Sequence, residues 1–290
     1  MAAVEDRVIT APADRRTAVL DVIRGARRTI LLSLFRCTDE AIFEELANAT
    51  ARGVSVEALV TARAKGGRKK LAKLYRALKD ARVSVSMYSD PVVKYHAKYL
   101  VADDGPAVVA SLNFTKKCFS QTLDALVITD DSTVVDGLRR LMKADRESQP
   151  APESLTPRLI VGPERARRQL IGLIQQAQRT IRLVDAKLSD PEVVMLLKQR
   201  RHEGITVEIF NMKRLGDLKS HGKILLIDDA IAVVGSLSLA ALSLDFRREV
   251  AITVETPSAV GEVARLFDSI GGTVPSGSPD GIDAKGAALC

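Results

Sequence analysis

The sequence predicts an α/β protein made of two duplicated α-β-α-β units with mixed sheets and one site shared across a pseudo-twofold axis. A shift of 151 residues places Arg28-Thr29-Ile30 on Arg179-Thr180-Ile181 and Gly53 on Gly204. The pattern His-x-Lys, with an Asp seven residues after the His, also occurs twice, although the chain has only 3 histidines. A repeated motif inside a longer repeat indicates duplication.

The two copies differ in length between Gly53 and the first motif. From the motifs onward the shift is 125 residues, 221 minus 96, so the first copy carries 26 more residues (151 minus 125). We expect one unit over residues 1–148 and a second over 149–271, joined by a Pro-containing linker. The composition of residues 272–290 turns to Gly, Ser, Pro and Ala, which favours a disordered tail.

Paired boundary signals predict the elements of each unit. Proline is tolerated in the first helical turn, Asp is a good N-cap, and Gly commonly ends a helix. The residues that carry these signals recur in both copies: Pro12 and Pro163 at a first helix, Thr29 and Thr180 at a first strand, Asp39 and Asp190 at a second helix, and Gly53 and Gly204 at its end. Strands joined by such helices imply mixed sheets with parallel pairs.

Composition limits the protein class. The chain has 290 residues, of which 46% are hydrophobic, and a formal net charge of +7. Three widely spaced cysteines and a charged, non-apolar start suggest a reducing cytoplasm, and no apolar run approaches the roughly 20 residues that span a bilayer. The positive charge suggests a polyanionic partner, either nucleic acid or an anionic lipid surface.

The motifs place their side chains by strand alternation. His96 and Lys98 share one face, as do His221 and Lys223, whereas an odd spacing turns Asp103 away. We therefore expect Asp103 and its counterpart Asp228 to be structural turn residues.

A four-residue hairpin loop would complete a polar patch in each half. It would place Lys98 opposite Ser111 and His96 opposite Asn113. In the second copy the same count pairs Lys223 with Ser236 and His221 with Ser238.

This patch suits a phosphodiester. Lysines bring positive charge to the non-bridging oxygens, and Ser or Asn adds hydrogen-bond donors. One imidazole can attack phosphorus or act as a base while the other, protonated, acts as an acid. One His per half, with no Cys close in sequence, forms no usual ligand set, so we expect neither a metal nor a cofactor.

These residues resemble the phospholipase D superfamily, whose signature is His-x-Lys-x4-Asp followed by Gly-Ser-x-Asn in two copies that share one active site. The resemblance covers roughly residues 7 to 270. It implies a covalent intermediate on one His and a metal-independent reaction, with His96 as nucleophile and His221 as acid. It further implies that Asp124 and Glu249 orient the motif histidines.

The chain departs from the family signature in two places. Ala110 stands where Gly is usual, and Ser238 stands where Asn is usual. Because Ser238 still carries one hydroxyl donor, we expect reduced rather than abolished activity.

The extra segment of the first copy is strongly basic. Residues 63–82 hold nine Lys or Arg against one acid, Asp80, and their apolar residues fall on one helical stripe. An ordinary packed helix and a docking face for anionic membrane or nucleic acid are both open. With 4% aromatic residues, base stacking is poorly supported, which favours lipid.

The resemblance implies a phosphodiesterase or phosphatidyltransferase acting on phospholipids, either phospholipase D or cardiolipin-synthase-like. The alternatives are a nuclease of the same superfamily and a non-catalytic member that binds polyanions. We expect a cytoplasmic protein with peripheral membrane contact.

Overall fold

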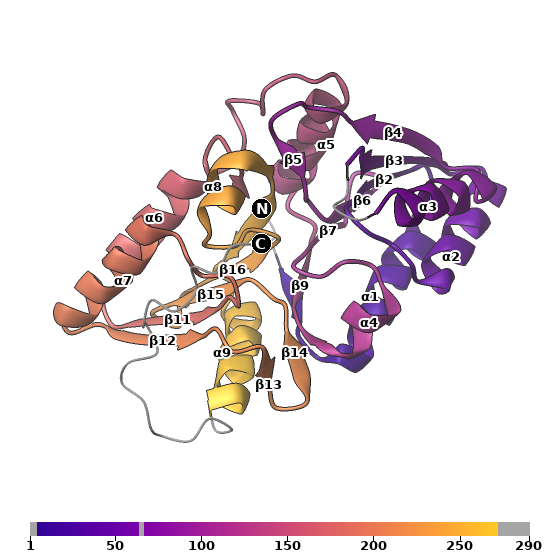
Figure 1. Ribbon diagram of the computed structural model, residues 1–290. Helices are drawn as coiled ribbons and strands as arrows, with labels where there is room; N and C mark the ends of the chain where they lie inside the picture. Colours follow the sequence, from indigo (N-terminus) through magenta and orange to yellow (C-terminus); the bar gives the residue numbers. More distant parts are fainter. Residues whose placement is uncertain (1–4, 64–66, 272–290) are drawn as a thin grey trace.

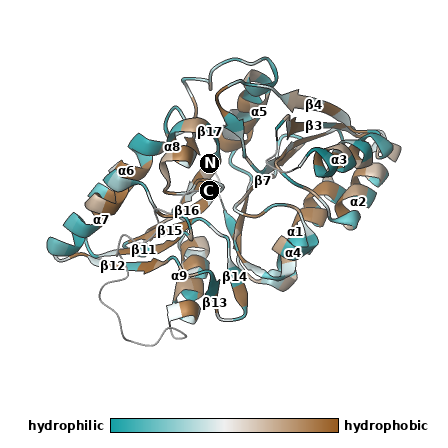
Figure 2. Ribbon diagram, viewed as in Figure 1, coloured by the Kyte–Doolittle hydropathy of each residue, from teal (hydrophilic) through white to brown (hydrophobic). Residues whose placement is uncertain are grey.

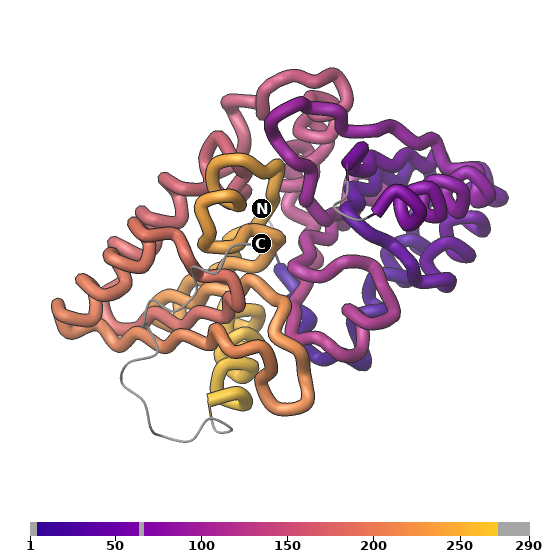
Figure 3. The backbone as a smooth tube through the Cα atoms, viewed as in Figure 1, coloured from indigo at the N-terminus to yellow at the C-terminus, as the bar shows by residue number. Residues whose placement is uncertain are grey.

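Two large mixed β-sheets, each covered by helices, form the body of the protein, and two small sheets of three and two strands join them (Figure 1). The computed structural model describes residues 5–63 and 67–271; the expected disordered tail, 272–290, lies outside the described residues. The predicted α/β class is confirmed. In Figure 3 the chain passes from the indigo and magenta half to the orange half through the pink segment after helix α5 (Ser132–Arg146).

The two sheets share a strand order. The first sheet runs β1-β9-β7-β6-β2-β3-β4 and the second β10-β18-β16-β15-β11-β12. The first contains β1 (Arg7–Ile9), β2 (Thr29–Leu34), β3 (Ser55–Thr61), β4 (Ser84–Tyr88), β6 (Tyr99–Ala102), β7 (Ala107–Ala110) and β9 (Leu126–Thr129). The second contains β10 (Leu159–Val161), β11 (Thr180–Val184), β12 (Thr206–Phe210), β15 (Ile224–Ile227), β16 (Ile231–Gly235) and β18 (Val250–Val254). This correspondence favours the predicted duplication.

The extra segment of the first copy adds one helix and one edge strand. Helix α3 (Arg68–Asp80) leads into β4, which pairs in parallel with β3. The second sheet ends at β12, the strand that corresponds to β3. The predicted helix in this segment is therefore confirmed.

The remaining helices largely follow the predicted boundaries. They are α1 (Pro12–Gly25), α2 (Glu40–Ala51), α4 (Lys116–Ser120), α6 (Ala166–Gln176), α7 (Pro191–His202), α8 (Ala241–Phe246) and α9 (Pro257–Gly271). Pro12 begins α1, but Pro163 precedes α6 by three residues, so that boundary was wrong. Gly53 and Gly204 end α2 and α7 with φ of 87° and 91°, which favours glycine.

The helix N-terminal aspartates are tied to the preceding helix in the same way in both halves. Arg16 pairs with Asp39 at 2.5 Å, and Arg167 pairs with Asp190 at 2.7 Å. Both aspartates are buried, so each needs a charged partner.

Apolar packing divides into two outer cores and one shared core. The outer cores bury α1 and α2 against the first sheet, and α6 and α7 against the second. The shared core joins the inner faces of both sheets with α5 and α9. Figure 2 shows the apolar strands inside and polar residues on the outlying helix α7. Among the helices of residues 5–63 and 67–271, none is long and apolar enough to cross a membrane.

The motif hairpins are one residue tighter than expected. Val101 lies opposite Ala107, and the Ala102 amide donates to the Pro106 carbonyl, so three residues, 103–105, close the turn. Asp103 and Gly105 take positive φ of 43° and 137° in this turn. Lys98 therefore faces Ala110, to which its carbonyl is bonded, and not Ser111.

The second hairpin shows the same shift. Ile227 lies opposite Ile231, so Lys223 faces Gly235 and not Ser236. The predicted pairings of His96 with Asn113 and of His221 with Ser238 are wrong by one residue for the same reason.

Asp103 and Asp228 bind backbone at these hairpin turns. The Asp103 carboxylate accepts from the amides of Arg27, Arg28 and Thr29 at 2.7–2.8 Å. Asp228 accepts in the same way from residues 178, 179 and 180. Burial would raise the pKa of Asp103, yet the three amide donors hold it below its usual 3.8. Each aspartate ties its hairpin to the start of a central strand.

We predict that Asp103→Asn lowers the free energy of unfolding by about 1 kcal/mol, since the half-exposed turn loses a charged acceptor. The deficit should be complete above pH 3.8 and should fade as the pH drops through the lower folded pKa. Denaturant unfolding measures it. The matched control is Asp104→Asn at the exposed neighbour, which should cost less; equal costs for both variants would refute the turn role.

Candidate active site

The candidate active site lies where the halves exchange backbone hydrogen bonds. Strand β5 (Lys94–Tyr95) pairs in parallel with β17 (Arg247–Arg248), and β14 (Leu218–Ser220) pairs in parallel with β8 (Thr122–Leu123); β13 (Arg214–Leu215) extends β14. The register sets Tyr95 opposite Arg248 and Ser220 opposite Leu123. The next residue of each motif strand is its histidine, and the next residue of each partner strand is a carboxylate from the other half.

Each motif histidine bonds the carboxylate of the other half. His96 Nδ1 lies 2.8 Å from Glu249 Oε2, and His221 Nδ1 lies 3.0 Å from both Asp124 oxygens. An ionised carboxylate only accepts, so Nδ1–H is the donor in both pairs. The other ring nitrogen, Nε2, then carries the lone pair, and that of His96 lies 3.3 Å from Lys98 Nζ. Asp124 and Glu249 were expected to orient the histidines; in the structure each contacts the histidine of the opposite half.

Hydroxyl groups hold both buried carboxylates. Asp124 accepts from Ser111 Oγ and from Thr122 Oγ1, each at 2.6 Å, and Glu249 accepts from Ser243 Oγ at 2.9 Å. Burial would raise the pKa of each carboxyl, but the facing imidazole and these donors lower both, that of Glu249 to about 2. Both groups are therefore ionised at neutral pH.

Burial favours the neutral form of both motif histidines. Burial lowers the pKa of His96 to about 3, against the opposing charge of Glu249 and with a further contribution from Lys98. Burial also lowers the pKa of His221, opposed by Asp124. The His221 side chain is 27% exposed and that of His96 is 14% exposed, so His221 has the freer contact with solvent.

Two buried lysines add positive charge beside the imidazoles. Lys98 Nζ donates to His96 O at 2.6 Å, and Lys223 Nζ donates to His221 O at 2.5 Å. Burial lowers the pKa of Lys98 to about 7, opposed by Glu249 and assisted by the charge of Lys223. An anion between the two lysines would relieve this repulsion, which suits a phosphate group.

The small polar residues do not form the expected set of free donors. Ser111 is engaged with Asp124, and Ser236 Oγ with the carbonyl of Val250 at 3.3 Å. Ser238 Oγ lies 2.8 Å from a buried carboxylate, Asp185, so our expectation that it offers a donor to substrate was wrong. Asn113 Oδ1, an acceptor, is buried without a partner.

Sequence reasoning missed an aromatic wall on one histidine. The Phe35 ring lies 4.4 Å from the His96 ring, and Lys98 Nζ lies 5.4 Å from the Phe35 centroid. The repeat shift places Ala186 at this position in the second half. The two imidazoles therefore have different surroundings. The only sign of this difference in the sequence is Phe35, which directly follows the strand that ends at Leu34.

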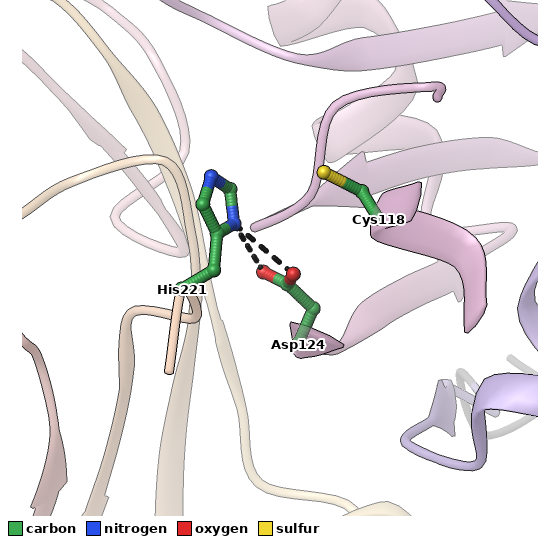
Figure 4. A group of neighbouring side chains, drawn as sticks. All are labelled: Cys118, Asp124 and His221. Carbon is green, nitrogen blue, oxygen red and sulfur yellow. Dashed lines mark hydrogen bonds and ion pairs between the residues drawn. The ribbon is translucent and has the colours of Figure 1, made fainter. Parts of the chain in front are cut away.

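Cys118 is a second residue that the sequence analysis missed, because it is far from His221 in the sequence but close to it in the fold. Its thiol, Asp124 and His221 offer ligand atoms that all lie within 4.8 Å of one another (Figure 4). This corrects the expectation that no Cys lies near a motif His. These three residues could hold a metal ion.

Comparisons with known proteins find a family model and relatives that match part of the chain. The family model described as "Cardiolipin synthase, PLD-like domain" matches residues 19–146. Cardiolipin synthase A of Pseudomonas entomophila (strain L48) is 28% identical over 127 residues, which are 43% of this chain and 26% of that protein. Phospholipase D of Rickettsia bellii (strain RML369-C) is 26% identical over 127 residues, 44% of this chain and 61% of that protein. The chain thus matches about a quarter of the cardiolipin synthase.

Solved structures match nearly the whole chain. Phosphatidylserine synthase of Haemophilus influenzae Rd KW20 superposes with a TM-score of 0.74 at 12% identity, covering 92% of this chain and 86% of that one. Polyphosphate kinase of Porphyromonas gingivalis superposes with a TM-score of 0.72 at 17% identity, covering 92% and 50%. At these identities the likeness shows the fold. The predicted resemblance to the phospholipase D superfamily is confirmed by these comparisons.

Proposed function

We propose that the protein is a phosphodiesterase or phosphatidyltransferase of phospholipase D type that acts on phospholipids through a phosphohistidine intermediate. The observation that carries the proposal is the pair of crossed His–carboxylate contacts flanked by two buried lysines. A neutral imidazole held at Nδ1 by a carboxylate is an activated nucleophile or base at Nε2. Two such groups supply both partners of a displacement at phosphorus.

In the first step Lys98, Lys223 and Asn113 bind the non-bridging oxygens of the substrate. His96 Nε2 forms a bond to phosphorus while the bond to the leaving oxygen breaks. His221, protonated, gives its Nε2 proton to that oxygen; Asp124 and the bound phosphate both favour this protonated form.

In the second step water or an alcohol attacks phosphorus. His221 Nε2 takes the proton of the incoming hydroxyl as the P–N bond to His96 breaks. The enzyme returns to its starting protonation state, and the incoming hydroxyl decides between hydrolysis and transfer.

The nucleophile is assigned to His96 because its surroundings keep it neutral and fixed. It is the more buried of the pair, Glu249 holds its Nδ1, and Phe35 packs against its ring. His221 is more exposed, as suits a group that exchanges protons with water or an alcohol.

We predict that His221→Ala releases about one equivalent of nitrophenol from bis(p-nitrophenyl) phosphate and then stops. A nitrophenolate needs no acid to leave, but the intermediate cannot be hydrolysed without the His221 base. Acid-free quenching and mass spectrometry should then place the phosphoryl adduct on His96. His96→Ala should give neither burst nor adduct.

His202→Ala is the matched control, because it removes the third histidine, which lies on exposed helix α7. It should retain full turnover. An adduct on His221 would reverse the assignment, and no adduct in any variant would rule out covalent catalysis.

Lipid is proposed as substrate because α3 and β4 border an amphipathic groove. Leu74 and Leu78 of α3 are buried, which leaves its basic residues outward. The groove has a volume of about 520 Å³, lined by Arg68, Leu71, Ala72, Tyr75, Arg76, Lys79, Asp80 and Met87. Basic groups around an apolar floor suit phospholipid headgroups with part of their chains.

We predict that replacing Arg68, Lys69, Lys70 and Lys73 with Gln weakens binding to vesicles containing phosphatidylglycerol. The loss should be about 1 kcal/mol for each basic residue near the membrane surface. Hydrolysis of the small nitrophenyl diester should hardly change, because these residues do not belong to the candidate active site around His96 and His221. Vesicle sedimentation measures the binding.

A control with equal charge loss spreads the substitutions over the surface, at Lys143, Arg168, Lys198 and Arg265, which are all exposed. It should weaken vesicle binding much less than the α3 variant. Equal losses would mean that only net charge matters. The nucleic-acid alternative is favoured if the α3 variant binds vesicles as tightly as the unmodified protein, but its affinity for DNA depends less steeply on salt concentration.

A further inference from the structure

A thiol, an imidazole and a carboxylate converge beside the proposed acid. The ligand atoms of Cys118, Asp124 and His221 all lie within 4.8 Å of one another. Figure 4 shows the Cys118 sulfur pointing toward the His221 ring, on the side where the ring bonds Asp124. Cys118 and Asp124 are buried, whereas the His221 side chain is 27% exposed. The cluster is therefore formed inside the protein but can be reached from solvent.

These three groups match the preferences of zinc. Zinc binds Cys sulfur at about 2.3 Å, His nitrogen at about 2.0–2.1 Å and carboxylate oxygen at about 2.0–2.2 Å, usually in a tetrahedron. Ligand atoms of such a tetrahedron are about 3.5 Å apart, so shifts of roughly 1 Å would close the cluster around an ion. One thiolate and one carboxylate offset the 2+ charge. Hard cations such as magnesium prefer sets of oxygen ligands.

The ligands are held in place by neighbouring groups. The Cys118 amide donates to Thr115 Oγ1 at 3.1 Å, and the Cys118 carbonyl accepts from Thr122 Oγ1 at 2.9 Å. The same Thr122 hydroxyl and that of Ser111 contact the Asp124 carboxylate at 2.6 Å. Outer contacts of this kind orient metal ligands and raise affinity.

The thiol belongs to only one half of the site. The shift of 125 residues that relates the motifs places Cys118 on Ser243. In the second half that serine hydroxyl donates to Glu249, the carboxylate that holds His96, at 2.9 Å. A hydroxyl is a poor zinc ligand. The half-site at His221 therefore has a thiol, Cys118, that zinc can bind, whereas the half-site at His96 has only the hydroxyl of Ser243 in its place.

We infer that Cys118, Asp124 and His221 form a zinc-binding site that competes with the hydrogen bond between His221 and Asp124. Zinc takes the place of the Nδ1 proton of His221, which moves to Nε2, and the thiol releases its proton to water. The fourth position is left for water. One proton is released for each ion bound.

Zinc in this position would switch off the proposed acid. An imidazole bound to a metal through Nδ1 carries its one proton at Nε2, and loss of that proton would leave an imidazolate. His221 would then be too weak an acid to protonate a leaving oxygen and would have no free nitrogen to act as a base. This inhibition rests on the proposed function. Zinc binding itself rests only on the three side chains.

The test uses the full chain with Cys290→Ser, so that Cys37 and Cys118 are its only thiols. Zinc is titrated in competition with a chromogenic chelator, and cobalt replaces zinc to reveal a thiolate-to-metal charge-transfer band. Cys118→Ser is compared with Cys37→Ser. Cys37 is the matched control because it is buried and burial raises the pKa of its thiol to about 12.

We expect one equivalent of zinc and a cobalt–thiolate band in the parent and in Cys37→Ser. Cys118→Ser should lose the band and bind zinc more than about 100-fold less tightly, beyond the effect of losing an outer contact. Unchanged binding in Cys118→Ser, or no binding in the parent, would overturn the inference. Cys118→Ala serves as a second variant and should lose the band and the zinc affinity as Cys118→Ser does. Thermal unfolding curves of both variants check that they are folded.

An activity arm separates this inference from the proposed function. Zinc should inhibit nitrophenyl diester turnover in Cys37→Ser, and inhibition should need at least about 100-fold more zinc in Cys118→Ser. If no variant turns over a phosphodiester, the proposed function fails while the binding titration still decides the zinc site. Equal inhibition of both variants would contradict a site that contains Cys118.

Discussion

The crossed contacts between histidines and carboxylates are the constraint on which the rest of the structure depends. Asp124 and Glu249 have no exposed side-chain surface, and each faces an imidazole from the other half of the chain. A buried carboxylate without a partner costs several kcal/mol. Hydroxyls of its own half hold each carboxylate, and the facing imidazole from the other half completes the contacts. The shared apolar core and the exchanged strands β5, β8, β14 and β17 therefore form together with the site.

A second ionic contact fixes the strand that carries Glu249. Arg248, 3% exposed, donates to Asp145 at 2.7 Å and to Glu164 at 2.6 Å. Asp145 belongs to α5 of the first half, and burial raises its pKa to about 7 against the charge of Arg248. Arg248 is thus anchored to both halves of the chain. Because Glu249 is the next residue, this anchoring also fixes the position of the carboxylate that contacts His96.

Much of the fold could be predicted from the sequence, because local signals agreed with the tertiary structure. The paired glycines and aspartates mark helix ends, and the apolar stripe of the extra segment became α3. The edge strands β1 and β10 were missed, since three residues carry too little periodicity. The start of α6 was misplaced because Pro163 lies in the turn before the helix.

The site could be predicted as a set of residues but not as a set of contacts. The motif spacing located His96, His221 and their lysines, yet it could not show which carboxylate each imidazole bonds, because that depends on pairing between distant strands. Positive φ at Asp103 and Gly105 accompanies a hairpin register that differs by one residue from the predicted one. Cys118 lies 103 residues before His221 (221 minus 118), and only the folded exchange of β8 and β14 brings them together.

The imidazole signals of the protein test the crossed arrangement most directly. With only 3 histidines, ring nitrogen and Nδ1–H resonances can be assigned by single substitutions in nitrogen-15-labelled protein. Glu249→Gln should shift the signals of His96 and leave those of His221 in place, and Asp124→Asn should do the reverse. If Glu249→Gln instead shifted His221, each half would orient its own histidine, and the shared-site account would be contradicted.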